Sequence, residues 1–410
     1  MKKSTMALCS LAAILAATPV MAAEQETPFA DRLLGNAGGV RDALANIGAD
    51  VSVLYSGTAW HVDGGLKNGS NYEHLVTARL DVDGEKAYGL RGNSISVAAQ
   101  SGVGGHPNTR IGSIEDIDNN AENPNAVRLY EAYVMQTFLD ESLTALVGVR
   151  DLNADFVWTD MTANFIKPTF QIGQELAQTG QNGPSIFPFT GLAATLKYAP
   201  ANGLYVQGGA FDGVPMDQDH ARSTRVDPSR EDGALLIAEA GYAPRDNSMN
   251  KIGVGVWSYT TRADDLVDTK ANGDPEKHHT NGAYIVSSYQ FYNDEVAGRS
   301  VGAFFRYGMA NDDAQQTDWN YQAGLVANGW VPGRADGEIG FGFTQAHNSD
   351  KYRSANTPTD ASEHGFELYY LDQLTPAITV QPDLQYIVNP GTDTVTDDAA
   401  VVGLRVNVSF

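Results

Sequence analysis

The sequence predicts an all-β fold: a 16-stranded antiparallel transmembrane β-barrel with a short N-terminal periplasmic helix and long extracellular loops, one of which folds into the pore. Two observations carry this prediction. Sixteen segments alternate apolar and polar residues with a period of two, as strands with one apolar face do. The connections between them are alternately short and long, which is typical of bacterial outer-membrane barrels and unexpected for a soluble β-sandwich.

The N-terminus has the features of a secretory signal peptide over residues 1–23. Two lysines precede an apolar run over residues 6–20, which is too short to span a bilayer, and Ala22 and Ala23 offer a cleavage site. Cys9 is the only cysteine and lies inside this segment. The mature chain is therefore expected to form neither a disulfide nor a thiolate metal site. No later apolar run is as long as a transmembrane helix.

Residues 24–48 are predicted to form an N-terminal helical segment. Val40, Leu44 and Ile47 share one face of a helix at i, i+4 and i+7, and Gly48 can end that helix. We expect the helix to dock at the periplasmic mouth or in the barrel entrance, as a structural cap or as a gate.

The barrel domain is predicted over residues 49–410. In the stretch LVTARLDV, for example, apolar side chains alternate with Thr77, Arg79 and Asp81. The sixteen predicted strands are 49–61, 73–83, 93–101, 127–137, 142–150, 189–198, 203–212, 234–243, 252–261, 282–292, 300–309, 320–328, 337–345, 365–374, 378–387 and 400–410.

The gaps between these segments separate into two sets. Those after the even-numbered strands contain 3 to 9 residues, and those after the odd-numbered strands contain 10 to 38. Short turns would therefore gather at one end of the barrel, with both termini, and long loops at the other. A barrel of about 16–18 strands leaves an aqueous channel instead of a filled core.

The chain is acidic, with 27 basic and 50 acidic residues and a net charge of −23. Removal of the predicted signal peptide also removes its two lysines, which makes the net charge of the chain more negative. Binding a nucleic-acid backbone requires a positive surface, so no nucleic-acid partner is expected. A G-x-S-x-G nucleophile motif, which would favour an outer-membrane hydrolase, does not occur, and no enzymatic activity is expected. The remaining alternative to a membrane barrel is a soluble, exported, β-rich binding protein.

Several stretches of the sequence resemble the carbohydrate-selective porin family of the OprB type. They follow the family's order over essentially the whole mature chain, although Asn36-Ala37 stands where the family usually has Asp-Trp. The stretches are LLGNAGGVRDALANIGADVSVLYSG, RLYEAYV, GVRDLNADF, GPSIFPFTGLAATLKYAP, GLYVQGGAFDGVP, QPDLQYIVNPG and GLRVNVSF. The resemblance implies a passive outer-membrane channel for monosaccharides such as glucose. A general, weakly selective diffusion porin of the same fold is the alternative.

Selectivity in such a channel would come from charged, amide and aromatic side chains that face the lumen. Guanidinium and carboxylate groups can bind pairs of sugar hydroxyls, or they can pair across the lumen and stiffen it. Arg79, Glu131 and Arg150 are expected at the constriction because their strands adjoin the longest loops. The predicted pore-lining residues are Arg79, Asp81, Glu131, Arg150, Lys197, Glu239, Trp257, Arg306, Glu367, Gln381, Asp383 and Arg405.

The longest predicted loop covers residues 151–188 and is rich in aromatic and amide residues. Loops of this length are uncommon unless they are functional. We expect it to fold into the pore and narrow it, with Trp158 or Phe165 offering a ring face to the sugar. The alternative is that these aromatic side chains only pack the loop against the inner wall.

A second loop, 102–126, contains acidic residues. Asp116, Asp118 and Glu122 provide the oxygen ligands that Ca²⁺ accepts, but the remaining spacing of an EF-hand is missing. A solvated acidic loop is therefore favoured over a Ca²⁺ site, and no cofactor is expected. His278 and His279 are likewise expected to be solvated in an exposed loop.

The chain ends in an alternating strand whose last residue is Phe410. We expect Phe410 in the periplasmic aromatic girdle, and its position resembles the signal read by the outer-membrane assembly machinery. The expected partners are monosaccharide solutes, outer-membrane lipid and lipopolysaccharide, and that machinery. The expected location is the outer membrane. The sequence leaves both a monomer and a homotrimer open.

Overall fold

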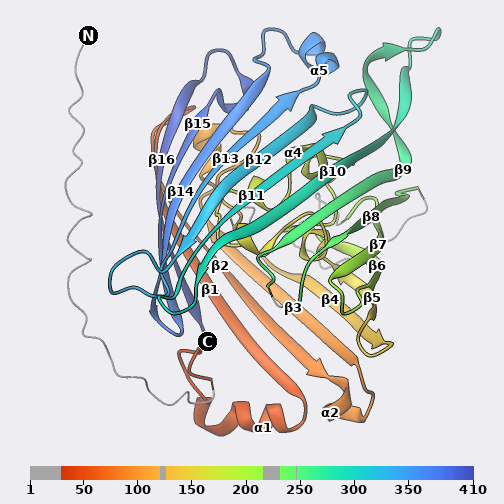
Figure 1. Cartoon of the computed structure of the whole chain (residues 1–410). Helices are drawn as coiled ribbons and strands as arrows, with labels where there is room; N and C mark the ends of the chain where they lie inside the picture. The colour runs from red at the N-terminus through yellow and green to blue at the C-terminus, as the bar shows by residue number, and fades with distance from the viewer. Residues whose placement is uncertain (1–28, 121–125, 216–230, 246) are drawn as a thin grey trace.

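Sixteen antiparallel strands close into one barrel (Figure 1). The computed structural model describes residues 29–120, 126–215, 231–245 and 247–410, so the predicted signal peptide lies outside the described residues. Each strand pairs with its neighbours in sequence, and β1 closes the barrel by pairing with β16. The strands are β1 (Ala49–Gly65), β2 (Gly69–Asp83), β3 (Asn93–Gly104), β4 (Val127–Phe138), β5 (Leu143–Arg150), β6 (Gly191–Tyr198), β7 (Leu204–Asp212), β8 (Ala234–Tyr242), β9 (Lys251–Thr269), β10 (Pro275–Asp294), β11 (Arg299–Ala310), β12 (Thr317–Asn328), β13 (Glu338–Asn348), β14 (Ser362–Thr375), β15 (Ile378–Val388) and β16 (Asp397–Ser409).

Helices are short and lie in the connections. No helix in the described part of the chain is long and apolar enough to cross a membrane. The α-helices are α1 (Val40–Asn46), α2 (Gly84–Tyr88), α3 (Asn108–Ile111), α4 (Gln174–Ala177) and α5 (Asp350–Ala355), and the 3-10 turns are η1 (Ala37–Gly39), η2 (Leu152–Ala154), η3 (Asp160–Thr162), η4 (Pro168–Phe170) and η6 (Pro390–Thr392).

The strands carry apolar side chains on the outer face, and their inward face carries polar side chains together with apolar ones that pack against loops inside the barrel. On β16, Val402 and Leu404 are exposed, whereas Arg405, which follows Leu404, is buried. On β9, Val254 and Val256 are exposed on the outer face. A closed barrel satisfies every strand's backbone hydrogen bonds, and its apolar outer face can meet hydrocarbon. The prediction of a 16-stranded barrel is confirmed.

Three predicted loops are wrong, because the strands continue through them. β9 and β10 extend to a turn at 270–274, and this hairpin projects from the upper right of the barrel in Figure 1. The β1–β2 and β11–β12 connections shrink to 66–68 and 311–316. Strand extensions that stand in water need no apolar face, so they lack the alternation by which strands are recognised.

The predicted N-terminal helix is present as α1, and Gly48 follows it with a positive φ of 79°. It lies beside β1 at the end of the barrel where the C-terminus lies (Figure 1). A bidentate pair between Arg32 and Asp50, at 2.7 and 2.9 Å, ties the segment to β1. Val40 and Ile47 remain exposed, so the apolar stripe of the helix is not buried in the barrel.

Candidate functional site

Two connections at the end opposite α1 fold into the barrel. One joins β5 to β6 through residues 151–190, and we call it the long inner loop. The other joins β3 to β4 through residues 105–126, and we call it the acidic inner loop. The sequence anticipated an inward course only for the first of them. Both pack their apolar side chains against the inward faces of the strands.

The long inner loop is packed like a protein core. Phe156, Val157 and Leu176 from the loop pack against Trp257, Tyr284 and other inward residues of β7 to β10. A fully buried side chain of this kind contributes about 1.5–3 kcal/mol. Several such side chains hold the loop against the wall, which favours a fixed structure over a moving lid.

A buried ion pair fixes the long inner loop to β11. Arg306 donates from Nη2 to Glu175 Oε1 at 2.5 Å and from Nη1 to Oε2 at 3.2 Å. Both residues are almost fully buried, at 2% and 0% exposure. Gly308 leaves the room for this carboxylate, because a Cβ atom there would lie 2.0 Å from Glu175 Oε1. Arg306 was predicted to contact solute, but it anchors the loop.

Glu239 of β8 is a second anchor for the long inner loop. Its carboxylate accepts hydrogen bonds from the Val157 backbone at 3.1 Å and from the hydroxyls of Tyr205 and Tyr284 at 2.8 and 2.7 Å. Lys251 Nζ lies 3.1 Å from the same carboxylate. These donors occupy its oxygen atoms, so Glu239 also serves the loop and not a passing solute.

Lys167 joins the two inner loops to each other and to the wall. Its Nζ donates to the backbone oxygen of Asp116 at 2.7 Å and lies 3.2 Å from Glu115 Oε2. Its backbone N–H donates to Glu367 of β14 at 2.9 Å, and the Glu115 backbone N–H donates to Glu363 at 3.2 Å. Lys167 and the three glutamates are all fully buried.

The described part of the acidic inner loop, residues 105–120, is not a solvated loop, because several of its side chains are buried. Asp118 is buried, and its two oxygens accept hydrogen bonds from Arg405 Nη2 and Trp60 Nε1, each at 2.5 Å. These donors replace the cation that the carboxylate would otherwise need. Glu122 lies outside the described residues. Arg405, like Arg306, therefore anchors a loop.

The sequence did contain a signal for this inward course. Ile111, Ile114 and Ile117 recur at three-residue intervals among the acidic residues, and Ile111 and Ile117 are fully buried against Trp60 and other wall residues. Regularly spaced isoleucines in an acidic loop indicate packing, because a solvated loop has no use for them.

Arg79, Glu131 and Arg150, which were expected together, form one network. Glu131 accepts from Arg79 Nη2 at 2.6 Å and from Arg150 Nη1 at 3.0 Å. Arg150 also forms a bidentate pair with Asp155 of the long inner loop, at 2.8 and 2.9 Å. The Arg79 side chain keeps 27% of its surface exposed, whereas Glu131 keeps 2%. Arg79 is therefore the member that is open to the lumen.

A β-bulge that the sequence analysis did not foresee lies beside this network. The β3–β4 register slips between Leu129 and Glu131, which leaves Tyr130 as the extra residue. Bulges re-aim side chains next to functional sites. Tyr130 donates its hydroxyl to Asp151 while Glu131 still reaches both arginines. Strict alternation would have placed only one of these two neighbours inside.

The aromatic residues predicted to face sugar divide into two groups. Phe165 is 1% exposed and packs edge-to-face on Phe304 and Tyr369, so its ring has no open face. This agrees with the alternative that its aromatic side chain packs the loop against the inner wall. Trp257 is buried in the same way. Trp158 is half-buried, and its Nε1 donates to the backbone oxygen of Ala154 at 3.4 Å. Of the two proposed sugar-stacking rings, only Trp158 keeps accessible surface.

The remaining predicted residues also have definite places. Gln381 donates to the backbone oxygen of Asn164 at 2.7 Å and so contacts the long inner loop. Asp383 accepts at 3.0 Å from Gln385, whose side chain also donates to the backbone oxygen of Ile117 in the acidic inner loop at 2.8 Å. Asp81 is half-buried on β2. Lys197 is exposed on β6, with its Nζ 5.5 Å from the centre of the Tyr205 ring.

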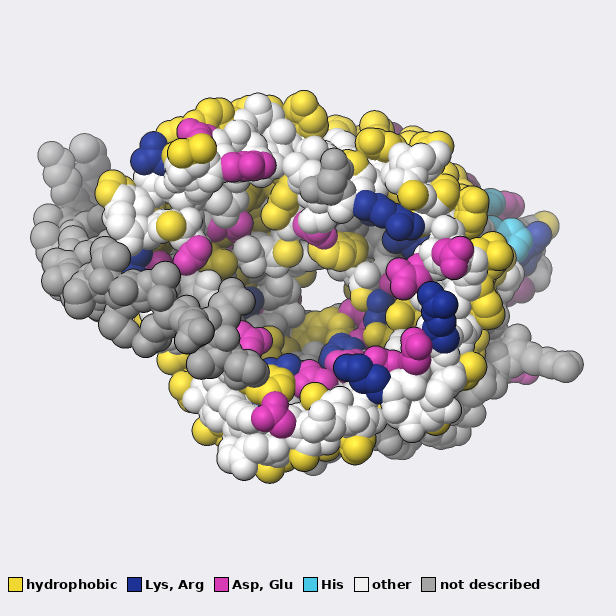
Figure 2. Space-filling model, turned by 60° about the horizontal axis from the view of Figure 1, so that its bottom comes forward, with side chains coloured by type: hydrophobic (Ala, Val, Ile, Leu, Met, Phe, Trp, Pro, Cys, Tyr) yellow, Lys and Arg dark blue, Asp and Glu magenta, His cyan; other side chains and the backbone are white. Residues whose placement is uncertain are grey.

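An opening passes through the molecule beside the two inner loops. Figure 2 shows it from the end that carries α1, with acidic and basic side chains around its edge. Several buried charges, such as Arg306 with Glu175 and Arg405 with Asp118, are paired with one another and form a fixed charged frame.

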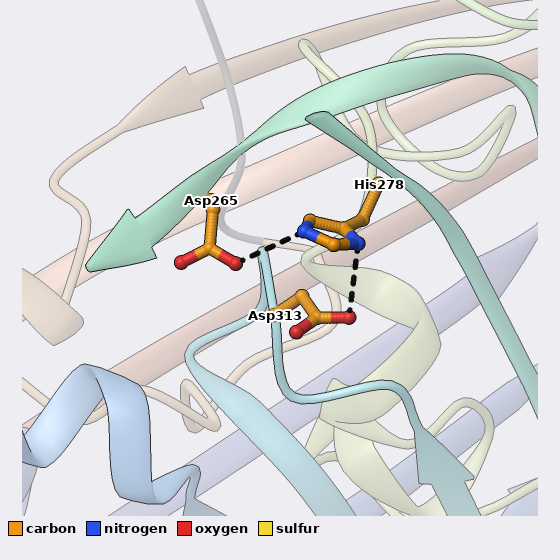
Figure 3. Close-up of side chains that lie close together, drawn as sticks. All are labelled: Asp265, His278 and Asp313. Carbon is orange, nitrogen blue, oxygen red and sulfur yellow. Dashed lines mark ion pairs between the residues drawn. The ribbon is translucent and has the colours of Figure 1, made fainter. Parts of the chain in front are cut away.

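A separate charged cluster ties the tall β9–β10 hairpin to neighbouring loops. His278 lies between Asp265 and Asp313, with nitrogen-to-oxygen distances of 3.2 and 3.4 Å (Figure 3). Lys351 of α5 places its Nζ 2.5 Å from Asp265, 2.7 Å from Asp313 and 2.8 Å from Asp268. The lysine ammonium occupies the position that a metal ion would take among these groups. The expectation that His278 is solvated in a loop is wrong.

Acidification is expected to release α5 from the hairpin. The hydrogen bond from Lys351 lowers the pKa of Asp313, and the hydrogen bonds that Lys351 donates to three aspartates raise the pKa of Lys351. The stabilisation from the Asp313–Lys351 ion pair is therefore complete above the ordinary carboxyl pKa of about 4. It is lost as the pH falls through the lowered pKa of Asp313. Burial raises the pKa of Asp265, but the hydrogen bond from Lys351 outweighs it and lowers that pKa to about 2. Amide hydrogen exchange in α5, corrected for its intrinsic pH dependence, should therefore be faster at about pH 2 than at pH 7. In the Lys351→Met variant, the α5 amides should exchange fast at both pH values. Equal protection of α5 in the variant and in the intact protein would contradict the prediction.

These features define a class of protein: an outer-membrane diffusion channel, which passes solutes and carries out no chemistry. Within that class, the chain belongs to the family described as carbohydrate-selective porin, OprB family, whose model matches residues 67–410. It is therefore a sugar-selective channel of the outer membrane and not an enzyme. The family resemblance drawn from the sequence is confirmed.

Individual relatives agree with this assignment. Porin B of Pseudomonas aeruginosa is 25% identical over 98% of this chain and 96% of its own length. A putative porin, QuiX, of Acinetobacter baylyi is 23% identical over 92% and 93% of the two chains. The high-pH structure of Pseudomonas putida OprB superposes with a TM-score of 0.83 at 23% identity, covering 94% of this chain and all of the other, which confirms the fold.

Proposed function

We propose that the channel admits monosaccharides through a lumen narrowed by the two inner loops, with Arg79, Glu131 and Arg150 at the constriction. The observation that carries this proposal is the anchored state of both loops. Buried ion pairs and apolar clusters hold them across the lumen beside an open passage (Figure 2). A fixed, narrow and wet passage can discriminate solutes by hydrogen bonding while still letting them leave.

The test is passage of a panel of solutes through the purified protein in liposomes. Glucose and other monosaccharides should enter faster than disaccharides and faster than amino acids of similar size. Equal rates for sugars and size-matched amino acids would support the alternative, a general diffusion porin of the same fold. In planar bilayers, glucose should reduce the ion current if it occupies the narrow part of the lumen.

The Glu131→Gln variant is expected to shift ion preference toward anions. Glu131 is the carboxylate shared by Arg79 and Arg150, and only Asp155 would remain to balance two guanidinium groups. A unit charge about 7 Å from a passing ion is worth about 0.6 kcal/mol at the dielectric constant of water, or about threefold in relative permeability. The zero-current potential across a KCl gradient measures this shift. Glu295→Gln, in the exposed turn 295–298, is the matched control and should leave the potential unchanged.

The outer surface suits lipid and lipopolysaccharide as partners. Exposed apolar side chains such as Val254, Val256 and Phe341 cover the strands on this face. The same belt could be covered in part by copies of the chain in a homotrimer, or wholly by lipid around a monomer. Light scattering on the detergent-solubilised protein separates these two states.

Deleting Phe410 is expected to impair assembly in cells. The Phe410 backbone N–H donates to Val53 of β1 at 2.8 Å, and its oxygen accepts from the Val53 N–H at 3.3 Å, so the last residue completes the seam between β16 and β1. We infer that the aromatic ring is also read by the assembly machinery. The yield of folded, heat-modifiable protein in outer membranes should fall severalfold. Phe410→Tyr, which keeps the backbone and an aromatic ring, should assemble normally.

In vitro refolding separates the two roles of Phe410. If the deletion variant refolds into detergent as well as the intact protein does, the defect in cells belongs to recognition. If refolding fails equally, the loss belongs to the barrel seam, and the recognition role is refuted.

A further inference from the structure

A cavity of about 290 Å³ lies between the two inner loops and the wall strands β2 to β4. We call it the inter-loop cavity. Its volume is near the lower end of the range of about 300–1,000 Å³ that is usual for small-ligand sites. None of the residues that line it is a lysine or an arginine. This absence distinguishes the cavity from the neighbouring Arg79–Glu131–Arg150 network.

One side of the inter-loop cavity is lined by carboxamides. Asn119 and Asn120 come from the acidic inner loop, and Asn153 and Gln171 come from the long inner loop. All four are only partly buried. Asn120 Nδ2 donates to Ser56 Oγ at 2.7 Å, which fixes the orientation of its amide. Gln171 Nε2 already donates to the backbone oxygens of Thr162 and Phe165, at 3.0 and 2.8 Å, whereas its Oε1 accepts no hydrogen bond from the described residues. This side therefore offers a carboxamide acceptor to hydroxyl groups, which can donate.

The carboxylates of the cavity are already engaged. Asp118 pairs with Arg405 behind the lining. Asp151 accepts from the backbone N–H of Asn153 at 2.7 Å and of Phe187 at 3.3 Å, and from the Tyr130 hydroxyl. Without an unpaired cation, the cavity offers nothing to an anion. A neutral solute loses little by entering it.

The opposite side of the cavity is apolar. Pro168, Ile172, Ile186 and Phe187 line it, and the Phe187 ring is half-buried, with its centre 6.1 Å from that of Tyr130 in an edge-on arrangement. A sugar ring has one C–H face that can pack on such a surface while its hydroxyls point the other way. An open-chain polyol lacks this division of faces.

From this geometry we propose that the inter-loop cavity is a binding station for a neutral monosaccharide in its ring form. The C–H face lies on Phe187, and the hydroxyls contact Asn119, Asn120 and Gln171. The inference rests on the proposed monosaccharide channel and adds a defined resting position to it. The backbone N–H of Asp151 donates to Glu131 at 3.3 Å, so the station adjoins the charged constriction. A solute that leaves the station meets Arg79 next.

The experiment titrates the ion current of single channels with glucose, with open-chain sorbitol and with the gluconate anion. The intact protein should show saturable block by glucose and weaker block by sorbitol and gluconate. Phe187→Ala should weaken the apparent affinity for glucose by about fivefold, as expected for loss of one aromatic contact. Asn120→Ala should also weaken it, and both variants should weaken glucose block more than sorbitol block. Phe305→Ala, on the exposed outer face of β11, is the aromatic control, and glucose should block its ion current as it blocks that of the intact protein.

The outcomes separate the station from the channel. Glucose passage in liposomes with no saturable block, or with block unaffected in both variants, would overturn the station and leave the monosaccharide channel standing. Absence of glucose passage through the intact protein would overturn both. If one variant has an altered conductance without sugar, its lumen is rearranged. The apparent glucose affinity of the other variant then tests the station.

Discussion

Replacing Arg306 with alanine is expected to detach the long inner loop from β11 and to raise the conductance of the channel. The guanidinium makes a bidentate pair with Glu175, and both side chains are almost fully buried. Removing one member of a buried pair leaves an uncompensated charge and costs about 3–5 kcal/mol. Glu175 could relieve that cost by moving toward water in the lumen, and the loop segment around α4 would have to move with it.

Single-channel recordings should show a larger and noisier current for Arg306→Ala than for the intact protein. The matched control is the double variant Arg306→Met, Glu175→Met, which removes both charges and keeps similar volume. Replacing a buried pair with apolar residues is often neutral, so this variant should return toward the original conductance. If Arg306→Ala conducts like the intact protein, the apolar cluster around Phe156 and Leu176 is sufficient to hold the loop, and the anchoring role of the ion pair is wrong.

The barrel was predictable from the sequence because the bilayer imposes a local rule on every strand. Val402 and Leu404 face outward and Arg405 faces inward whatever lies elsewhere in the chain, so alternation alone reveals the strand. The rule ends where the bilayer ends. The β9–β10 hairpin beyond it has solvent around it, and its sequence was therefore mistaken for a loop.

The site was less predictable because its contacts join distant residues. Ser113 donates to Glu363, 250 positions away, and Arg405 donates to Asp118 across 287 positions. The sequence identified arginines and glutamates that face the lumen, but it could not say whether each meets a solute or a loop. Arg79 and Arg306 look alike in sequence, and only burial separates a residue at the lumen from an anchor.

Replacing Lys167 with methionine is expected to loosen both inner loops together. This lysine is fully buried and is the ammonium group nearest to the buried carboxylate of Glu115, which also accepts from Asn320 Nδ2 at 3.0 Å. Glu363 and Glu367 lie in the same buried region and hold the backbones of the two loops. Among the described residues, no lysine or arginine other than Lys167 forms an ion pair with these carboxylates. Removing the ammonium therefore leaves their repulsion uncompensated, and the cost is again about 3–5 kcal/mol.

The two anchors differ in what they should release. Arg306 ties only the long inner loop, whereas Lys167 contacts both loops, so Lys167→Met should raise hydrogen exchange in residues 105–120 as well as in residues 151–190. Acidic pH should partly restore protection, because protonating one carboxylate removes the uncompensated charge. Lys270→Met, which removes an exposed lysine in the turn at 270–274 and lies far from both inner loops in sequence, should leave exchange unchanged. Faster exchange in the long inner loop alone would mean that the acidic inner loop is held by Arg405 and its isoleucines, and that Lys167 does not couple the two.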